Sequence, residues 1–205
     1  LNYDGKFGLN NMNLYFQNAN TKSQVYTWAE WTFKVRDPVI FLDTKRSSLL
    51  YNNLKGRIVD ISKRDSAILF TLDIDTILTE RQCRNESFEF VDVTDLGTRI
   101  RLEVIANDDE SAAEEERIKT IIPFQIAYAV SIHKAQGLEY NSVKIIIPSY
   151  NAEKISHSIF YTAITRAKEK LKIFWSAETM KAIIESFEKE KIGQRTLEVI
   201  EKKLK

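Results

Sequence analysis

The sequence is poor in cysteine and glycine, and each shortage excludes a kind of site. Cys83 is the one cysteine among 205 residues, so the chain has no internal disulfide framework and no Cys-rich metal site. None of the six glycines belongs to a G-x-x-x-x-G-K-[ST] segment. The chain therefore carries no Walker A loop, whose backbone would cradle phosphates and whose lysine would reach them. It also has no Asp-Glu pair at the end of an apolar strand to hold Mg²⁺.

Net charge and long apolar runs are missing as well. The 30 Lys and Arg residues nearly balance 29 Asp and Glu residues, which leaves a formal charge of +1 and no global basic field. Any contact with nucleic acid must therefore come from a local patch. No apolar stretch approaches the roughly 20 residues of a membrane span, and the first residues show no signal-peptide pattern. We expect a cytoplasmic protein with no membrane contact and with Cys83 as a reduced thiol.

The hydropathy pattern divides the chain into segments of different character. Short β-type runs alternate with turn signals between residues 32 and 106, which predicts a small antiparallel barrel. Residues 107–117, NDDESAAEEER, carry six acidic residues and one basic residue and are typical of a solvated linker. From residue 118 onward the pattern is α/β. Residues 177–204 predict one or two amphipathic helices, with an apolar stripe made of Met180, Ile183, Ile184 and Phe187.

The segment between residues 127 and 176 carries the most informative sequence patterns. AYAVSIHKAQGLEYNSVKIIIP sets a polar turn between two apolar runs, and FYTAITRAKEKLKIFWS sets an arginine in a Thr-rich helix before another apolar run. The layout predicts strand, polar loop, strand, helix and strand, with the helix at residues 159–168. Ligands of open α/β sheets collect at the carboxyl ends of the strands, so the loop is a candidate site.

These two segments resemble motifs V and VI of superfamily 1 nucleic-acid helicases, as found in RecD-like and UvrD-like C-terminal domains. Residues 5–17, GKFGLNNMNLYFQ, resemble a stretch of the second motor domain of RecD-like helicases, and residues 37–61 resemble the SH3-like barrel inserted in that domain. The resemblance implies an α/β, RecA-like second motor domain without Walker A and with an inserted antiparallel barrel. Residues 1–31 would begin the motor domain, 32–117 would form the barrel and acidic linker, 118–176 would complete the motor domain, and 177–205 would form C-terminal helices.

Within these motifs, the resemblance implies that four residues contact the nucleotide. It makes Arg166 the catalytic arginine finger, and an always-charged planar donor suits the charge that develops during phosphoryl transfer. Gln136, Gly137 and Glu139 would bind nucleotide, since a glycine admits close backbone approach and a carboxylate accepts a ribose hydroxyl proton. The alternatives are a solvated helix arginine, a turn glycine and a surface glutamate.

The same resemblance implies that four residues bind nucleic acid: Ser131, His133, Lys134 and Thr162. A hydroxyl can bond a phosphate oxygen, and an imidazole can donate to phosphate or stack on a base. His133 could equally be a structural hydrogen-bonding residue. A metal role is not expected, because His157 is the one other histidine. A set of basic side chains interleaved with aromatic ones is compatible with single-strand binding or with ordinary solvation; it comprises Lys45, Arg46, Lys55, Arg57, Lys63 and Arg64 with Phe41 and Tyr51.

Helicases of this superfamily hydrolyse ATP in a cleft between two RecA-like domains, and this chain supplies one wall of such a cleft. The resemblance therefore implies a C-terminal fragment of an ATP-dependent DNA helicase. Its partners would be single-stranded DNA and the N-terminal RecA-like domain of the same parent chain, which would bind most of the ATP and Mg²⁺. Two alternatives stay open: a non-catalytic interaction module that kept the fold, and a helicase that acts on RNA.

Overall fold

The computed structural model describes residues 3, 5–42, 46–106 and 120–189. The chain divides into two compact units, one made of Leu1–Gly8 with Val130–Lys205 and the other of Leu9–Ala129. The domain boundaries expected at residues 31, 117 and 176 stay predictions. The acidic segment 107–117 and the last residues of the expected C-terminal helices lie outside the described residues.

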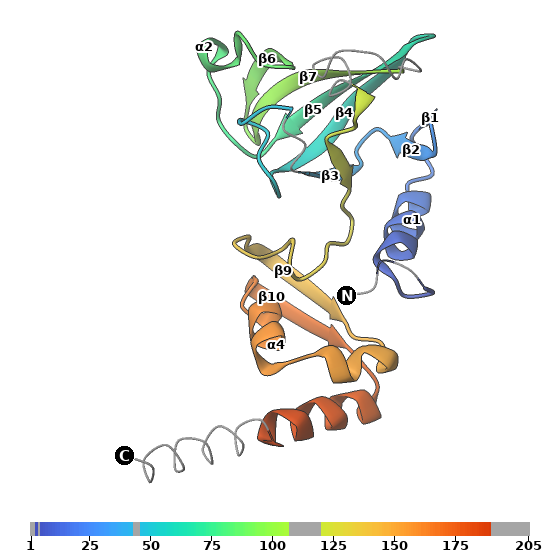
Figure 1. Ribbon diagram of the computed structural model, residues 1–205, viewed down its shortest axis with the longest axis vertical. Coiled ribbons are helices and arrows are strands. Elements are labelled where there is room, and N and C mark those ends of the chain that lie inside the picture. Colours follow the sequence, from blue (N-terminus) through green and yellow to red (C-terminus); the bar gives the residue numbers. More distant parts are fainter. Residues whose placement is uncertain (1–2, 4, 43–45, 107–119, 190–205) are drawn as a thin grey trace, which may run out of the picture. The chain divides into compact units, whose positions relative to one another are not determined.

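The unit Leu9–Ala129 is built on a six-stranded antiparallel sheet (Figure 1). Its strands follow the order β6-β7-β5-β4-β3-β8, and each strand pairs antiparallel with its neighbours. The strands are β3 (Pro38–Phe41), β4 (Lys55–Lys63), β5 (Ala67–Ile74), β6 (Glu89–Thr94), β7 (Gly97–Ile105) and β8 (Phe124–Ile126), with the short helix α2 (Glu80–Cys83) between β5 and β6.

The strands form where the sequence alternates apolar and polar side chains. Along β5, Ile68, Phe70, Leu72 and Ile74 are fully buried, while the residues between them are half-buried. Phe124 of β8 packs edge-on against Phe70, with ring centroids 5.1 Å apart. Because these side chains share one face of the sheet, they form a single apolar core beneath it.

The predicted closed barrel is not confirmed. In the described part of the chain β6 and β8 are the edges of the sheet and do not pair with each other. Register shifts between Ile58 and Asp60 in β4, and between Phe90 and Asp92 in β6, mark bulges that bend the strands locally. The turn between β6 and β7 requires Gly97, whose φ is +132° and whose Cβ would lie 2.1 Å from the Ile74 carbonyl oxygen.

Helix α1 (Leu9–Ala19) is held to this unit by buried amides. Asn13 accepts a hydrogen bond from the Ala129 N–H at 2.7 Å and donates to the Ala129 carbonyl at 3.1 Å. One turn later Gln17 donates to the carboxylate of Asp37 at 2.5 Å. Side chains four residues apart lie on one face of a helix, so Asn13 and Gln17 form a polar stripe that faces inward. The adjoining hairpin consists of β1 (Val25–Trp28) and β2 (Trp31–Lys34).

Part of the expected basic surface is not at the surface. Phe41 is fully buried in the core, and Arg46 is buried with its guanidinium donating to the carbonyls of Ile121 and Glu103. Burial lowers the pKa of Arg46 to about 10. Phe41 and Arg46 therefore fit neither of the two alternatives given for this set, strand binding or ordinary solvation, and Lys45 lies outside the described residues.

The second unit contains a parallel strand pair joined through helices (Figure 1). β9 (Tyr140–Ile146) is followed by the 3₁₀ helix η1 (Ser149–Lys154), α4 (His157–Ile164) and β10 (Ala167–Phe174). Parallel neighbours need such a crossover, and the coarse expectation of an α/β fold is confirmed. Residues 177–189 are helical. A core made of Ile145, Ile147, Ile155, Ala163 and Ile183 lies between the strands and these helices.

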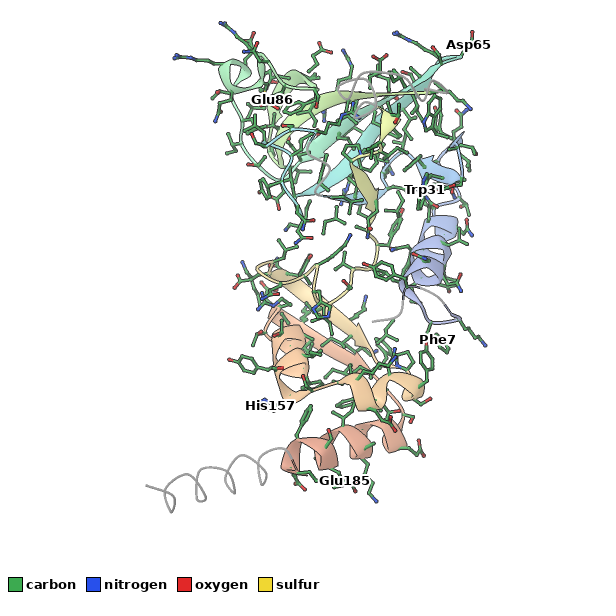
Figure 2. All side chains as sticks on the ribbon, in the orientation of Figure 1. Phe7, Trp31, Asp65, Glu86, His157 and Glu185 are labelled. Atoms are coloured by element: carbon green, nitrogen blue, oxygen red, sulfur yellow. The ribbon has the colours of Figure 1, made fainter. Side chains whose placement is uncertain are left out.

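Two helix predictions need correction. The helix expected at residues 159–168 begins at His157 and ends at Ile164, and Ala167 already belongs to β10. In the last described helix Ile183 is buried, whereas Met180 is 39% exposed and Ile184 is 46% exposed. His157, which is labelled in Figure 2, begins α4. The centroid of its ring lies 5.3 Å from that of Phe187. No helix among the described residues is long and apolar enough to cross a membrane.

Candidate functional site

The candidate site lies within the second unit, where the loop 131–139 meets the turn between α4 and β10. The expected location needs correction. β8, the strand before the loop, pairs antiparallel with β3 in the large sheet and is not a neighbour of β9. Glu139 and Arg166 each directly precede a strand of the parallel pair, β9 and β10 respectively. The two motifs therefore meet at the amino ends of these strands and not at their carboxyl ends.

Backbone hydrogen bonds fold the loop into consecutive tight turns. The N–H groups of Ala135, Gln136 and Leu138 donate to carbonyls three or four residues earlier, at 3.0, 3.2 and 3.0 Å. The Ser131 hydroxyl accepts from the N–H of Lys134 at 3.3 Å. Ser131 therefore caps the first turn, which is how serine satisfies backbone donors near a helix or turn start. Its hydroxyl proton remains available to donate to another acceptor.

Gly137 is at the position in the loop that requires a glycine. Its φ is +82°, a conformation that L side chains rarely adopt, and a Cβ at this position would meet no atom within 4 Å. The glycine therefore serves the turn itself and leaves open space beside the backbone. Gln136 and Glu139, on either side of this short stretch, are exposed.

Arg166 lies just beyond the end of α4 and is anchored by all three nitrogens of its guanidinium. Nε donates to the Thr162 carbonyl at 2.9 Å, and Nη1 donates to the Leu138 carbonyl at 3.1 Å. Nη2 donates to the Thr165 hydroxyl at 3.2 Å. The side chain is half-buried. The prediction that Arg166 projects from within a helix is wrong, because the chain has already turned toward β10 at this residue.

Three further contacts join the segment around Glu139 to the segment around Arg166. The N–H of Tyr140 donates to the Arg166 carbonyl at 2.9 Å. Tyr140 is also the register partner of Ala167 in the parallel ladder. The Lys168 ammonium lies 3.1 Å from the Glu139 carboxylate. Both of those side chains are more than half exposed, so the ion pair is weak and the carboxylate can exchange partners.

The predicted strand-binding residues differ in exposure. His133 is exposed, while Ser131, Lys134 and Thr162 are half-buried. Burial lowers the pKa of Lys134 below its ordinary value. The backbone carbonyl of Thr162 is used by Arg166, so the described role of this residue is to anchor that arginine.

Sequence reasoning missed the residues that anchor Arg166. The Leu138 carbonyl is a backbone group and leaves no signal in the sequence. Thr165 could have been noticed, because a hydroxyl next to an arginine at a helix end can bond both the helix carbonyls and the guanidinium. Its hydroxyl donates to the Tyr161 and Thr162 carbonyls, at 2.9 and 3.1 Å.

Acidic and histidine side chains do not gather around this loop. Within residues 3, 5–42, 46–106 and 120–189, no group of three or more His, Cys, Asp or Glu side chains could hold a metal ion. What the loop and the α4–β10 turn present instead is a guanidinium, an exposed amide, an exposed carboxylate and a hydroxyl. These groups suit phosphate oxygens and sugar hydroxyls.

Part of this chain is similar in sequence to known proteins. Residues 126–173 match the family model of the UvrD-like helicase C-terminal domain. RecBCD enzyme subunit RecD of Buchnera aphidicola is 30% identical over 103 residues, which are 50% of this chain and 17% of that protein. The ATP-dependent RecD2 DNA helicase of Deinococcus radiodurans is 29% identical over 86 residues, which are 42% of this chain and 11% of that protein.

Among solved structures, Pif1 helicase from Candida albicans is similar over 86% of this chain and 45% of that chain, with 16% identity and a TM-score of 0.47. The sequence matches confirm the expected resemblance to the C-terminal region of superfamily 1 helicases. This chain spans less than a fifth of the length of either sequence relative.

Proposed function

We propose that this chain is the C-terminal motor part of an ATP-dependent, RecD-like superfamily 1 DNA helicase. The observation that carries the proposal is the match of residues 126–173, which places Glu139 and Arg166 inside one family domain. The parallel ladder then sets these two residues side by side, through the hydrogen bond from the Tyr140 N–H to the Arg166 carbonyl. A carboxylate and a guanidinium that come from two motifs and stand on neighbouring stretches of backbone suit a nucleotide-binding wall.

The proposal includes a division of the chain. Residues 1–31 and 118–176 would form a RecA-like motor domain, with β9, α4 and β10 as part of its core. Residues 32–117 would be an SH3-like insertion, and the antiparallel sheet of β3 to β7 supplies its strands. Support comes from the single apolar core under that sheet and from its bulges, which are devices that small β-domains use to curve.

ATP is the ligand that the exposed groups fit. Gln136 and Glu139 can bond sugar hydroxyls, Arg166 can bond phosphate, and the open space beside Gly137 leaves room for close approach. The described residues do not fit a divalent cation, so Mg²⁺ would reach this wall with the phosphates and would be held by the partner domain. When bound, ATP supplies the phosphoanhydride bond whose hydrolysis drives the motor.

In this mechanism, Arg166 neutralises charge on the transferring phosphoryl group. Its planar fork can bond two phosphate oxygens through two parallel N–H groups, a fixed geometry that an ammonium does not reproduce. Ser131, His133, Lys134 and Thr162 would form part of the track for single-stranded DNA. Their hydroxyls, imidazole and ammonium can bond phosphate without regard to base sequence, as a translocating motor requires.

The test uses the full-length protein that contains these residues. We expect ATP hydrolysis that is stimulated by single-stranded DNA, and a fall in kcat of about 10³-fold in Arg166→Ala with a much smaller change in ATP affinity. Arg166→Lys should restore little of the rate. His133→Ala should weaken strand binding and stimulation but spare nucleotide binding. Near-normal kcat in Arg166→Ala would refute the arginine-finger assignment.

A control variant separates this role from a general loss of structure. Lys168→Ala removes an exposed ion pair two residues away and should leave kcat almost unchanged. If the full-length protein binds single strands but hydrolyses no ATP, the chain is a non-catalytic module that kept the fold. Stimulation by RNA and not by DNA would assign it to the RNA helicases.

A further inference from the structure

We propose that Arg166 and Thr165 form a latch that holds the loop 131–139 in its described conformation, and that a phosphate drawing away the guanidinium would release the loop. Thr165 is a positioning residue in this arrangement, because its hydroxyl fixes the guanidinium without touching a ligand. The link between loop and turn rests on the hydrogen bonds described above. The release of the loop by phosphate rests also on the proposed function.

The guanidinium bridges the two motifs. Nη1 bonds the Leu138 carbonyl in the loop, and Nε bonds the Thr162 carbonyl at the end of α4. Leu138 in turn donates its N–H to the Ala135 carbonyl, and Ala135 donates to the Ser131 carbonyl. A continuous chain of hydrogen bonds therefore runs from Arg166 to Ser131, the first of the predicted strand-binding residues.

Thr165 sets the resting position of the guanidinium. Its hydroxyl proton is donated to the carbonyls of Tyr161 and Thr162, so its lone pairs face Nη2 of Arg166. With this third acceptor in place, all three guanidinium nitrogens are bonded within the unit. These bonds use three of the five guanidinium N–H donors, so a phosphate can reach the one that each Nη keeps, but a phosphate that pulls the guanidinium toward itself must break the bonds to Leu138 and Thr165.

A phosphate that draws the guanidinium away from these three acceptors therefore competes with closure of the latch. When Arg166 bonds phosphate, the Leu138 carbonyl loses its charged donor, and the turns between Ser131 and Leu138 lose a support. Because the same loop carries Ser131, His133 and Lys134, the occupancy of the nucleotide wall would change the strand track. The ladder bond from Tyr140 to the Arg166 carbonyl uses backbone atoms and can persist in both states.

Amide hydrogen exchange on the chain of residues 1–205, followed by NMR, tests the latch without any helicase activity. We expect Arg166→Ala to speed exchange of the Ala135, Gln136 and Leu138 amides roughly tenfold, which equals about 1.4 kcal/mol of lost protection. Thr165→Ala should speed it about threefold. Thr165→Ser keeps the hydroxyl and should restore the wild-type rates.

Two controls separate the latch from loss of the fold. Lys168→Ala breaks the other side-chain link between the segments and should leave these amides unchanged. The Ile145 amide, inside β9, reports on the unit as a whole. If it also loses protection in Arg166→Ala, then Thr165→Ala and Thr165→Ser decide the question. Unchanged loop protection in both alanine variants would overturn the latch.

The competition with phosphate is tested separately, with sodium tripolyphosphate as the probe. In the wild-type chain it should shift the Arg166 Nε–H signal and speed exchange of the Leu138 amide together. A shift of that signal with unchanged exchange at Leu138 would overturn the release step, and so would the absence of any shift at the highest soluble concentration. Neither outcome depends on whether the full-length protein is a helicase, so failure here and failure of the proposed function are distinguishable.

Discussion

Removal of the Asp37 carboxylate should destabilise the unit Leu9–Ala129 by several kcal/mol. This side chain is fully buried and accepts three hydrogen bonds. Gln17 Nε2 donates to it at 2.5 Å, the Lys34 backbone N–H at 2.8 Å and the Tyr128 hydroxyl at 2.8 Å. Asp37→Ala leaves all three donors without this acceptor and removes a negative charge that attracts the buried Lys34 ammonium.

The magnitude follows from these contacts. Each buried donor that loses its partner costs about 1–3 kcal/mol, so three orphaned donors amount to several kcal/mol. Tyr128→Phe removes one donor and keeps the carboxylate, so it should cost only about 1–2 kcal/mol. The ratio between the losses of unfolding free energy in these two variants distinguishes a connected network from three independent hydrogen bonds.

Urea denaturation followed by tryptophan fluorescence measures this loss. All variants are made in a Trp175→Phe background, so that the signal comes from Trp28 and Trp31, which both lie in the unit under test. A loss below about 1 kcal/mol for Asp37→Ala would refute the reasoning, because it would mean that water replaces the carboxylate at no cost.

The pH dependence gives a second readout of Asp37. Burial raises the pKa of this carboxyl above its ordinary value of 3.8, although its hydrogen bonds oppose the shift. The folded state therefore holds this proton more tightly than the unfolded state. The contribution of Asp37 to stability should be full below pH 3.8 and should fall as pH rises through the folded pKa. The stability difference between wild type and Asp37→Asn should show that fall.

Three further predictions concern activity, strand binding and turns. The isolated chain of residues 1–205 should show no ATPase activity in a phosphate-release assay, and turnover that disappears in Arg166→Ala would contradict this. It should bind a labelled single-stranded oligonucleotide weakly and lose that binding as salt rises, because its net charge is only +1. Tight binding at moderate salt would count against the proposal that this chain supplies only part of the path for the strand. In urea denaturation, Gly97→Ala should cost about 3 kcal/mol or more, since it adds backbone strain to an overlap with the Ile74 carbonyl, whereas Gly137→Ala should cost only about 1–2 kcal/mol of strain. Equal losses at the two glycines would contradict this reading of the turns.

The antiparallel strands could be predicted because their signal is local. Alternation of apolar side chains in the segment 67–74 specifies both the strand and the face that is buried. Closure of the sheet depends on pairing between β6 and β8, which are far apart in sequence, and no local pattern reports on it. The expectation of a barrel therefore went further than the pattern allowed.

The end of α4 shows why the site was only partly predictable. The run Arg166-Ala167-Lys168-Glu169-Lys170 consists of good helix formers, and propensity alone continues the helix through it. In the fold the same run enters β10, because its backbone pairs with β9. Tertiary pairing therefore overrides local propensity, and it moves Arg166 from a helix surface to a turn where three acceptors surround it.

Buried polar side chains could not be predicted from the hydropathy pattern either. Asn13, Gln17 and Arg46 are all buried, yet a hydropathy pattern counts each of them as a surface residue. Each is buried because its polar atoms meet backbone groups or charges that only the tertiary structure supplies. The residues that anchor Arg166 escape prediction for the same reason, since two of its three acceptors are backbone carbonyls.

The proximity of Glu139 and Arg166 is therefore a property of the strand ladder and of the core beneath it. Neither side chain contacts the other; their backbones are joined through the pairing of Tyr140 with Ala167. From Ser142 onward the buried face of β9 and β10 fixes the register, with Ile145 opposite Ile173, and a bulge between Ala167 and Lys170 leads back to the pairing of Tyr140 with Ala167. A slip of one residue would turn this face outward, so the register is strongly specified wherever the core is apolar. The apolar core under the parallel strands is thus what positions the two charged groups, and the polar site depends on it as much as on its own hydrogen bonds.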